Sequence, residues 1–524
     1  MSTPSGGTLH QSLLDLVSSL SRESPPLLPV TQNVPCVYLI VHNGYEDVFD
    51  LLAEIGYFDK HVQELTRLNS VAKKESLAGT GCLWSALVKG NVGLAEKIIK
   101  LSGVGDGGDG DGGADIFNCY DEKVAPSPLI ICSQNGVGGS VDFILSKLQE
   151  AEDEEKRRIY LEQRMPSKDA ATALFKASQN GHLEICKKLV SMGADINVKT
   201  SLDNFTPLII ACSVGSLNVV DWLLGESSLI FFDENTKPIM GPLHAACFKG
   251  NIEIIKRLTV FLDTMHEWSS WKEALVCSDN GFSCLHYACL PENSRGVLEA
   301  LLGVEGVEKS FKIRNEFCKG LLLPAGKEKY NAVMLCCVKS YSSSISYLLN
   351  FAEKSGPGYV EKLVNSLDAQ GRNSVFLSVE RDSTPCCKIL TSYKASSTIY
   401  SNSVSPLHIA SYNDNPTICS LLLSSGADVH YKCIFKSKNP ITARSIANQR
   451  DNKCCEILMS ASKRSKGPPT TVPKWAQEYV RDIQGCKVCG KGGKRCGRCK
   501  KVFYCGKVCQ GKDWKEHKII CKPC

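Results

Sequence analysis

The residues best suited to chemistry are seven cysteines and one histidine near the end of the chain. They are Cys486, Cys489, Cys496, Cys499, Cys505, Cys509, His517 and Cys521. Zn²⁺ takes four thiolate or imidazole ligands in a tetrahedron, and a two-residue gap between cysteines lets both thiolates reach one metal. Eight such ligands suffice for two closed sites, which are structural because no coordination position is left open for a substrate. Spacing alone does not fix which ligands share a metal.

The order of these ligands, with Tyr504, Gln510 and Trp514 between them, resembles a MYND zinc finger. The resemblance implies one zinc on Cys486, Cys489, Cys505 and Cys509 and a second on Cys496, Cys499, His517 and Cys521. It also implies a groove for short proline-containing peptides of the P-x-L-x-P kind, to which Gln510 and Trp514 contribute. An indole face offers proline an apolar platform, and a glutamine amide can bond an extended backbone. Packing within the small zinc core is the alternative role for Trp514.

Upstream of the finger, residues 31–460 repeat one pattern. The clearest copies have their signature alanine at Ala177, Ala211, Ala246, Ala288 and Ala410. Weaker copies lie around Cys36, Ala86, Cys132, Cys336, Ser378 and Ala447. These copies resemble ankyrin repeats, each of which buries its apolar face only by stacking on its neighbours. The resemblance implies an all-α fold, with a solenoid of about ten repeats, several of them degenerate, followed by the small two-zinc finger.

Each copy carries local signals for a pair of helices. Thr206 and Pro207 predict the start of a first helix, because threonine caps a helix and proline is tolerated at its first position. The expected exits from first helices are Gly181, Gly215 and Gly250, since glycine readily takes positive φ. A second helix with an apolar face, such as Ile185 and Leu189, should pack on the next repeat.

Three histidines, His244, His286 and His408, occupy the same position of the repeat pattern. We expect them to make structural hydrogen bonds, because no catalytic partners accompany them. More generally, the chain has no P-loop, no nucleophile elbow, no H-E-x-x-H and no dinucleotide fingerprint. We therefore expect no catalytic residues, no small-molecule substrate and no enzyme activity.

Composition shifts predict the remaining segments. Residues 1–30 should form a flexible N-terminus, and residues 461–484 a Pro- and Lys-rich linker with a short helix over 475–484. Two loop inserts are expected in the array. Residues 103–115 are rich in Gly and Asp but lack EF-hand spacing, which favours a flexible acidic linker. Residues 150–165 are highly charged and predict a solvated helix between repeats. Long gaps after Ala246 and Ala288 predict further inserted loops.

The number of cysteines and the net charge limit the cell compartments in which the protein can work and the partners that it can bind. The chain has 27 cysteines and a net charge of +6, of which residues 485–524 carry +10 and the remainder −4. Most upstream cysteines lie among apolar residues, and no basic region precedes the short N-terminal apolar run. We therefore expect free thiols in the reducing cytoplasm or nucleus and no secretion. No apolar run of about eighteen residues predicts a membrane span.

Together these patterns predict a non-enzymatic adaptor for protein–protein interaction. Ankyrin stacks offer a concave surface to one protein partner, and the finger would bind proline-containing motifs of another. The alternative is a zinc-dependent, nucleic-acid-associated or transcriptional regulator that uses the basic finger. It is the weaker interpretation because the finger has neither the C2H2 spacing nor a recognition helix.

Overall fold

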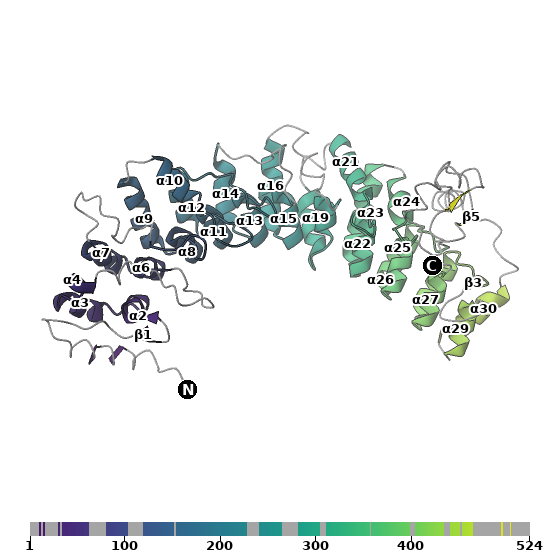
Figure 1. Ribbon diagram of the computed structural model, residues 1–524. Coiled ribbons are helices and arrows are strands. Elements are labelled where there is room, and N and C mark those ends of the chain that lie inside the picture. Colours follow the sequence, from purple (N-terminus) through teal and green to yellow (C-terminus); the bar gives the residue numbers. More distant parts are fainter. Residues whose placement is uncertain are drawn as a thin grey trace. The chain divides into compact units, whose positions relative to one another are not determined.

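A computed structural model gives the fold of the chain (Figure 1). It describes residues 10–11, 14–15, 30–31, 34–61, 80–102, 119–150, 154–227, 240–264, 281–303, 311–356, 358–398, 404–433, 441–450, 453–464, 494–495 and 503–504. The chain divides into two compact units, Met1–Gly320 and Leu321–Cys524.

Unit 1 contains helix pairs, each made of a first and a second helix in contact. The first helices are α2 (Cys36–His42), α6 (Cys82–Lys89), α8 (Pro128–Asn135), α11 (Ala173–Asn180), α13 (Pro207–Val214), α15 (Pro242–Lys249) and α18 (Cys284–Ala288). The second helices are α3 (Glu46–Glu54), α7 (Val92–Leu101), α9 (Gly138–Glu150), α12 (Leu183–Ser191), α14 (Leu217–Gly225), α16 (Ile252–Thr264) and α19 (Ser294–Leu302). Three further helices are α4 (Tyr57–His61), α10 (Glu154–Leu161) and α21 (Phe311–Leu322), the last of which crosses the division between the units.

Unit 2 repeats the same arrangement. Its first helices are α22 (Ala332–Lys339), α25 (Ser374–Glu380), α27 (Pro406–Tyr412) and α29 (Ala443–Gln449). Its second helices are α23 (Ser342–Ser355), α26 (Thr384–Ser392), α28 (Pro416–Ser424) and α30 (Cys454–Arg464), and α24 (Tyr359–Asn365) lies between α23 and α25. The described strands form three antiparallel hairpins: β1 (Val30–Thr31) with β2 (Val34–Pro35), β3 (Lys432–Cys433) with β4 (Ile441–Thr442), and β5 (Lys494–Arg495) with β6 (Phe503–Tyr504).

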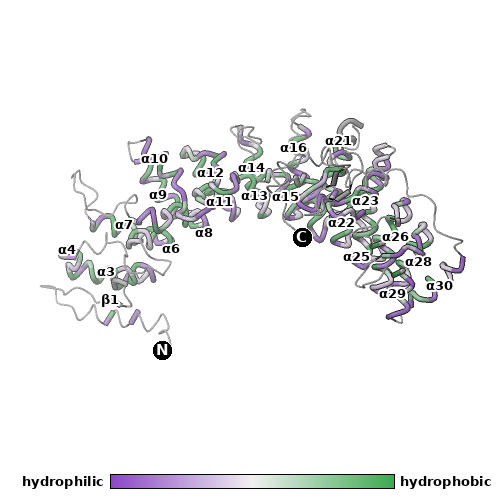
Figure 2. The backbone as a smooth tube through the Cα atoms, turned by 45° about the vertical axis from the view of Figure 1, so that its right-hand side comes forward, coloured by the Kyte–Doolittle hydropathy of each residue, from purple (hydrophilic) through white to green (hydrophobic). Residues whose placement is uncertain are grey.

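Within each unit the pairs stack in sequence order. In unit 1, α8, α11, α13 and α15 lie in one row, and α9, α12, α14 and α16 lie in another (Figure 1). All five signature alanines, Ala177, Ala211, Ala246, Ala288 and Ala410, are fully buried. Many helices alternate between hydrophobic and hydrophilic segments along the tube (Figure 2). The core is therefore a continuous layer between neighbouring pairs, since one pair cannot bury its own apolar face. The all-α solenoid expected from the sequence is confirmed.

The residues predicted to start and end the first helices do so in the structure. The Thr206 side chain accepts a hydrogen bond from the Ile209 backbone N–H at 3.3 Å, and Pro207 occupies the first position of α13. The first helices α11, α13 and α15 end at glycines with φ of +75°, +95° and +79°, which are Gly181, Gly215 and Gly250. A side chain at these positions would be strained, because L-residues rarely adopt that conformation.

Two of the expected inserts and the expected linker differ in detail from the segments that the structure describes. Residues 150–165 contain α10, but its last turn is anchored, because Tyr160 and Leu161 are only 2% exposed. Part of the gap after Ala288 is α21 and not a loop. The charged residues of α10 are accessible, as the charge pattern predicts, and its last turn is held because burying one large side chain contributes about 2 kcal/mol,. The last helix, α30, runs past Ser460 to Arg464 and shortens the linker.

Other expected segments lie wholly or largely outside the described residues. Residues 103–115 and the helix expected over 475–484 are among these. Of residues 1–30, positions 10–11 and 14–15 are helical, and Nε2 of His10 lies 2.9 Å from a carboxylate oxygen of Asp47.

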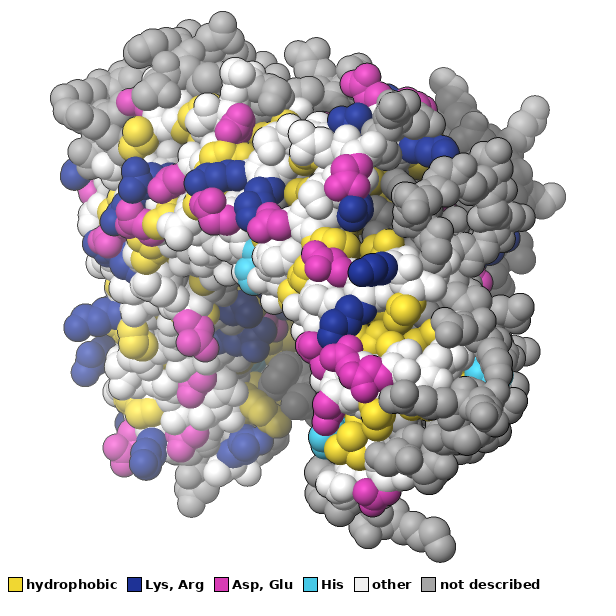
Figure 3. All heavy atoms as spheres, turned by 90° about the vertical axis from the view of Figure 1, so that its left-hand side faces the viewer, with side chains coloured by type: hydrophobic (Ala, Val, Ile, Leu, Met, Phe, Trp, Pro, Cys, Tyr) yellow, Lys and Arg dark blue, Asp and Glu magenta, His cyan; other side chains and the backbone are white. Residues whose placement is uncertain are grey.

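Ion pairs join the second helices of unit 1 at a recurring position. Lys97 on α7 lies 2.7 Å from Asp50 on α3, and Lys188 on α12 lies 2.6 Å from Asp142 on α9. A third pair joins Arg257 on α16 to Asp221 on α14 at 3.6 Å. Figure 3 shows that cationic and anionic side chains lie next to one another on the face turned to the viewer. The side chains of each pair are about half exposed, and such a pair contributes less than about 1 kcal/mol to stability. These pairs therefore neutralise charges between neighbouring repeats but add little to the stability of the stack.

Candidate functional site

The predicted zinc ligands and peptide-groove residues lie outside the described residues. They are Cys486, Cys489, Cys496, Cys499, Cys505, Cys509, Gln510, Trp514, His517 and Cys521. The part of the finger that is described is the hairpin β5/β6, in which Lys494 pairs with Tyr504 and Arg495 with Phe503. In the sequence, Cys496 follows β5 directly and Cys505 follows β6 directly. A donor set of seven thiols and one imidazole suits Zn²⁺ chemically.

The described residues contain a second candidate, the accessible residues of the first helices of unit 1, which we call the first-helix face. In α6, α8, α11, α13 and α15 the last two residues of each helix are accessible. Those at the last position are Lys89, Asn135, Asn180, Val214 and Lys249. Because these helices stack in sequence order, equivalent positions form rows across the repeats,.

An aromatic cluster is the most prominent apolar feature of this face. Phe248 at the end of α15 is 41% exposed, although large apolar residues usually avoid solvent,. Its ring lies 5.6 Å edge-on from Tyr287 of α18, and Phe282 lies 5.5 Å from the same tyrosine. The ammonium of Lys249 lies 5.7 Å from the Phe248 ring centroid. An exposed aromatic ring that rests against a buried one, as Phe248 does against Tyr287, is a typical anchor of protein interfaces,.

Two of the three repeat-pattern histidines make the expected structural hydrogen bonds. Nδ1 of His286 lies 2.7 Å from the Ser283 hydroxyl, and Nδ1 of His408 lies 2.6 Å from the Ser405 hydroxyl. Nε2 of His408 also lies 3.1 Å from the Ile441 carbonyl oxygen. His286 and His408 therefore fasten the start of the first helices α18 and α27.

The expectation is wrong for His244. Neither of its ring nitrogens has a hydrogen-bond partner among the described residues, although the side chain is only 5% exposed. The physical reason is that Gly241 replaces the serine that would offer a hydroxyl at the start of α15. Burial lowers the pKa of His244 to about 4, so the imidazole is neutral at physiological pH,. Glycine at this position of the pattern is the sequence signal that would have revealed the difference.

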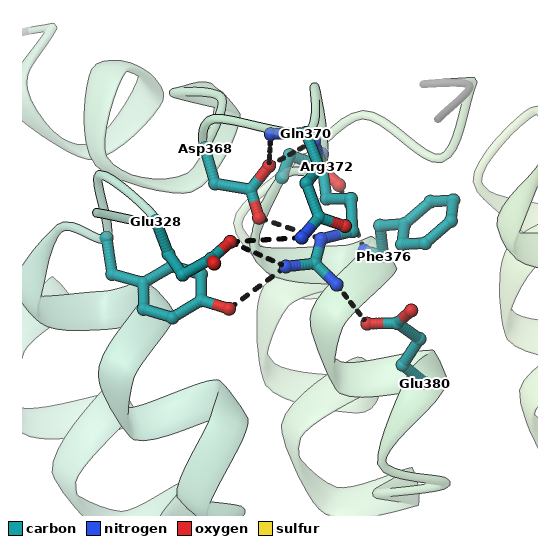
Figure 4. Close-up of polar contacts among 8 residues, drawn as sticks. Glu328, Asp368, Gln370, Arg372, Phe376 and Glu380 are labelled. Atoms are coloured by element: carbon teal, nitrogen blue, oxygen red, sulfur yellow. Dashed lines mark hydrogen bonds and ion pairs between the residues drawn. The ribbon is translucent and has the colours of Figure 1, made fainter. Parts of the chain in front are cut away.

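A polar network in unit 2 was not foreseen from the sequence (Figure 4). The Arg372 guanidinium donates to Asp368 at 2.7 Å, to Glu380 at 2.9 Å and to the Tyr330 hydroxyl at 2.9 Å. The Asp368 side chain is fully buried and Arg372 is 11% exposed. A further contact at 3.9 Å reaches Glu328 in the loop before α22. The network therefore ties the loop before α25 to the preceding repeat, which is a structural role.

The upstream cysteines whose side chains the structure describes form no disulfides, and apart from Cys455 these side chains are buried, as expected for thiols used as small hydrophobes. Burial raises the pKa of the Cys132 thiol to about 12 and that of Cys186 to about 11. The thiolate is the reactive species, so these side chains serve as small hydrophobes. Within the described ranges no three His, Cys, Asp or Glu side chains are placed to hold a metal ion.

Comparison with known families identifies both parts of the chain. The family model for ankyrin repeats in three copies matches residues 129–237 and 334–433, and the model for the MYND finger matches residues 486–521. The chain contains ankyrin repeats and a MYND finger. These matches fall on the stacked helix pairs of both units and on the eight predicted ligands, so both resemblances drawn from the sequence are confirmed.

Individual relatives are similar to this chain over short segments. Egl nine homolog 1 of Mus musculus is 52% identical over 44 residues, which are 8% of this chain and 11% of that protein. The ankyrin repeat and KH domain-containing protein mask-1 of Caenorhabditis elegans is 30% identical over 95 residues, 18% of this chain and 4% of that protein. Tudor domain-containing protein 1 of Danio rerio is 49% identical over 71 residues, 13% of this chain and 5% of that protein. The chain thus covers about a tenth or less of the length of each.

Ankyrin repeats and MYND fingers are non-catalytic interaction modules, and together they indicate a protein-interaction adaptor. The MYND finger implies zinc binding. Where the structure describes helices, none is both long and apolar enough to cross a bilayer.

Proposed function

We propose that this protein links two different protein partners, one held by the ankyrin array and the other by the MYND finger. The observation that carries the proposal is the presence of both modules in one chain, with family matches at residues 129–237, 334–433 and 486–521. Joining two weak binding modules raises the effective concentration of the second site once the first is occupied. Buried free thiols throughout the array support a reducing compartment, the cytoplasm or the nucleus,.

On the array, the partner would contact the first-helix face. This surface combines exposed aromatic and aliphatic side chains with neutral amides, as at Phe248, Val214 and Asn180. Second helices offer a poorer surface, because many of their charges are already matched in pairs such as Lys188–Asp142.

On the finger, two zinc ions would be held in interleaved sites, Cys486, Cys489, Cys505 and Cys509 for one and Cys496, Cys499, His517 and Cys521 for the other. This division is the one that the resemblance to the MYND finger implies, and the match of that family's model to residues 486–521 supports it. A P-x-L-x-P peptide would then bind against Gln510 and Trp514.

The test is a fluorescence-anisotropy titration of the zinc-loaded full chain with a labelled P-x-L-x-P peptide, at low and near-physiological salt. Saturable binding that tolerates salt and is lost in the Gln510→Ala/Trp514→Ala variant, with zinc content unchanged, would support the proposal. A short DNA duplex is titrated in parallel. Salt-resistant, sequence-dependent duplex binding without peptide binding would instead make the finger a nucleic-acid module.

A further inference from the structure

The charges of the first-helix face of unit 1 are all of one sign. None of the first helices α2, α6, α8, α11, α13, α15 and α18 contains an aspartate or a glutamate. Their charged side chains are Lys89, Lys176 and Lys249. The second helices of the same unit carry both signs. The acids of this unit's helix pairs are thus confined to the second helices.

The lysines of this face also differ from those of the second helices in their partners. Lys89 and Lys249 make no ion pair with any carboxylate that the structure describes, and Lys176 donates to the neutral amide of Gln179 at 3.0 Å. On the second helices, cations such as Lys97 and Lys188 lie within 2.7 Å of a carboxylate. The first-helix face therefore presents cations whose counter-charge a bound partner can supply.

The spacing of these lysines along the stack indicates that a matching partner is an extended peptide. Lys89, Lys176 and Lys249 stand on α6, α11 and α15, which are alternate first helices of the stack. Packed helices are roughly 8–10 Å apart, so successive lysines are separated by roughly 16–20 Å. An extended peptide covers that distance in about six residues. Two apolar side chains of the same face are exposed, Val214 at the end of the intervening helix α13 and Phe248 next to Lys249 on α15.

We propose that the first-helix face of unit 1 binds an acidic peptide segment that carries large apolar side chains. Its apolar residues pack on Phe248, whose ring rests against the buried Tyr287, and its carboxylates pair with Lys249 and Lys176. A nucleic acid fits less well, because three widely spaced lysines separated by aliphatic side chains do not follow a phosphate backbone with a charge every few ångströms. The loop before α11 carries both signs, with Lys168 next to Asp169, so the preference comes from the helices.

This inference rests on the proposed adaptor function and deepens it for the ankyrin array. The test uses the full zinc-loaded chain and a displayed library of random twelve-residue peptides. Peptides bound by the wild type but lost by Phe248→Ala are sequenced. The matched control is Val260→Ala, which truncates a 58% exposed side chain on the second helix α16 of the same repeat. Retained hydrogen-exchange protection of α15 and α16 shows that both variants are folded.

The expected result is that peptides dependent on Phe248 are enriched in Asp and Glu over the unselected library and contain Leu, Ile or Phe. For one such peptide, Lys249→Glu should weaken binding at least tenfold, while Lys256→Glu on α16 should leave it within twofold. Phe248-dependent peptides that are neutral or basic would overturn the inference while leaving the array a peptide-binding module. If no peptide depends on Phe248, both the inference and the array half of the adaptor proposal fall. Peptides lost by Gln510→Ala/Trp514→Ala report on the finger separately.

Discussion

Replacing Gly241 by serine should stabilise the repeat that contains α15. Helices α18 and α27 begin after Ser283 and Ser405, whose hydroxyls lie 2.7 Å and 2.6 Å from the imidazole of the histidine three residues on. Helix α15 begins after Gly241, and the nitrogens of His244 are buried without a described partner. The backbone at Gly241, with φ −79° and ψ 173°, is close to that at Ser283, with φ −84° and ψ 167°. Serine therefore fits without backbone strain.

The size of the effect follows from the missing hydrogen bond. A buried polar group without a partner costs about 1–3 kcal/mol, and a new hydrogen bond contributes about 1 kcal/mol net. Serine also caps a helix better than glycine by a few tenths of a kcal/mol. An added Cβ would lie 3.2 Å from Nδ1 of His244, so the ring must yield slightly. We expect a net gain of about 1–1.5 kcal/mol in Gly241→Ser, or roughly a tenfold change in the opening equilibrium.

Amide hydrogen exchange read by mass spectrometry measures this gain locally, because repeats of a solenoid open partly independently. Protection in peptides covering α15 should rise about tenfold in Gly241→Ser, while peptides covering α8 serve as an internal reference. Gly241→Ala is the matched control, since it adds the Cβ without the hydroxyl and should not stabilise the repeat. If serine is no better than alanine, or if its full gain persists in a His244→Leu background, the imidazole is not the partner and the reasoning is refuted.

The other predictions concern pH, the buried ion pair and zinc. Because burial lowers the pKa of His244 to about 4, below the usual 6.5, its contribution to stability is present above about pH 6.5 and is lost as pH falls toward 4. Exchange-derived stability of α15 should drop by about 2 kcal/mol between pH 7 and pH 5, and an undiminished drop in His244→Leu would contradict this. Arg372→Met should destabilise the fold by about 3 kcal/mol in urea denaturation, because it strands the buried Asp368 carboxylate,. Adding Asp368→Asn to this variant should restore part of the lost stability, because it removes the unpaired buried carboxylate. If stability is not restored, the unpaired charge is not the cause of the loss. Cys505→Ser should remove one of two zinc ions by metal analysis while Cys524→Ser keeps both; two retained ions in Cys505→Ser would show that the ligand assignment is wrong.

Local signals in the sequence were enough for the repeats. Thr206 and Pro207 start a helix and Gly215 ends it through contacts within a few residues, so their effect does not depend on distant parts of the chain,. Burial of Ala211 follows from the same regularity, because every copy of the pattern must stack on the next,. The zinc-ligand set stays a prediction from the spacing of the thiols, and the match of the MYND-finger model to residues 486–521 supports it,.

Only the tertiary structure decided which polar groups meet. Arg372 donates a hydrogen bond to the hydroxyl of Tyr330, which lies 42 residues away in the chain. No local sequence pattern predicts that contact. Gly241 signals in the sequence that His244 lacks the hydroxyl partner of His286, but only packing shows that no other described group takes its place. The acid-free first helices were also present in the sequence from the start. They became a single charged face only when stacking placed Lys89, Lys176 and Lys249 along one row of helices. Local propensities act over a few residues, whereas charge complementarity and burial depend on neighbours that the fold brings together.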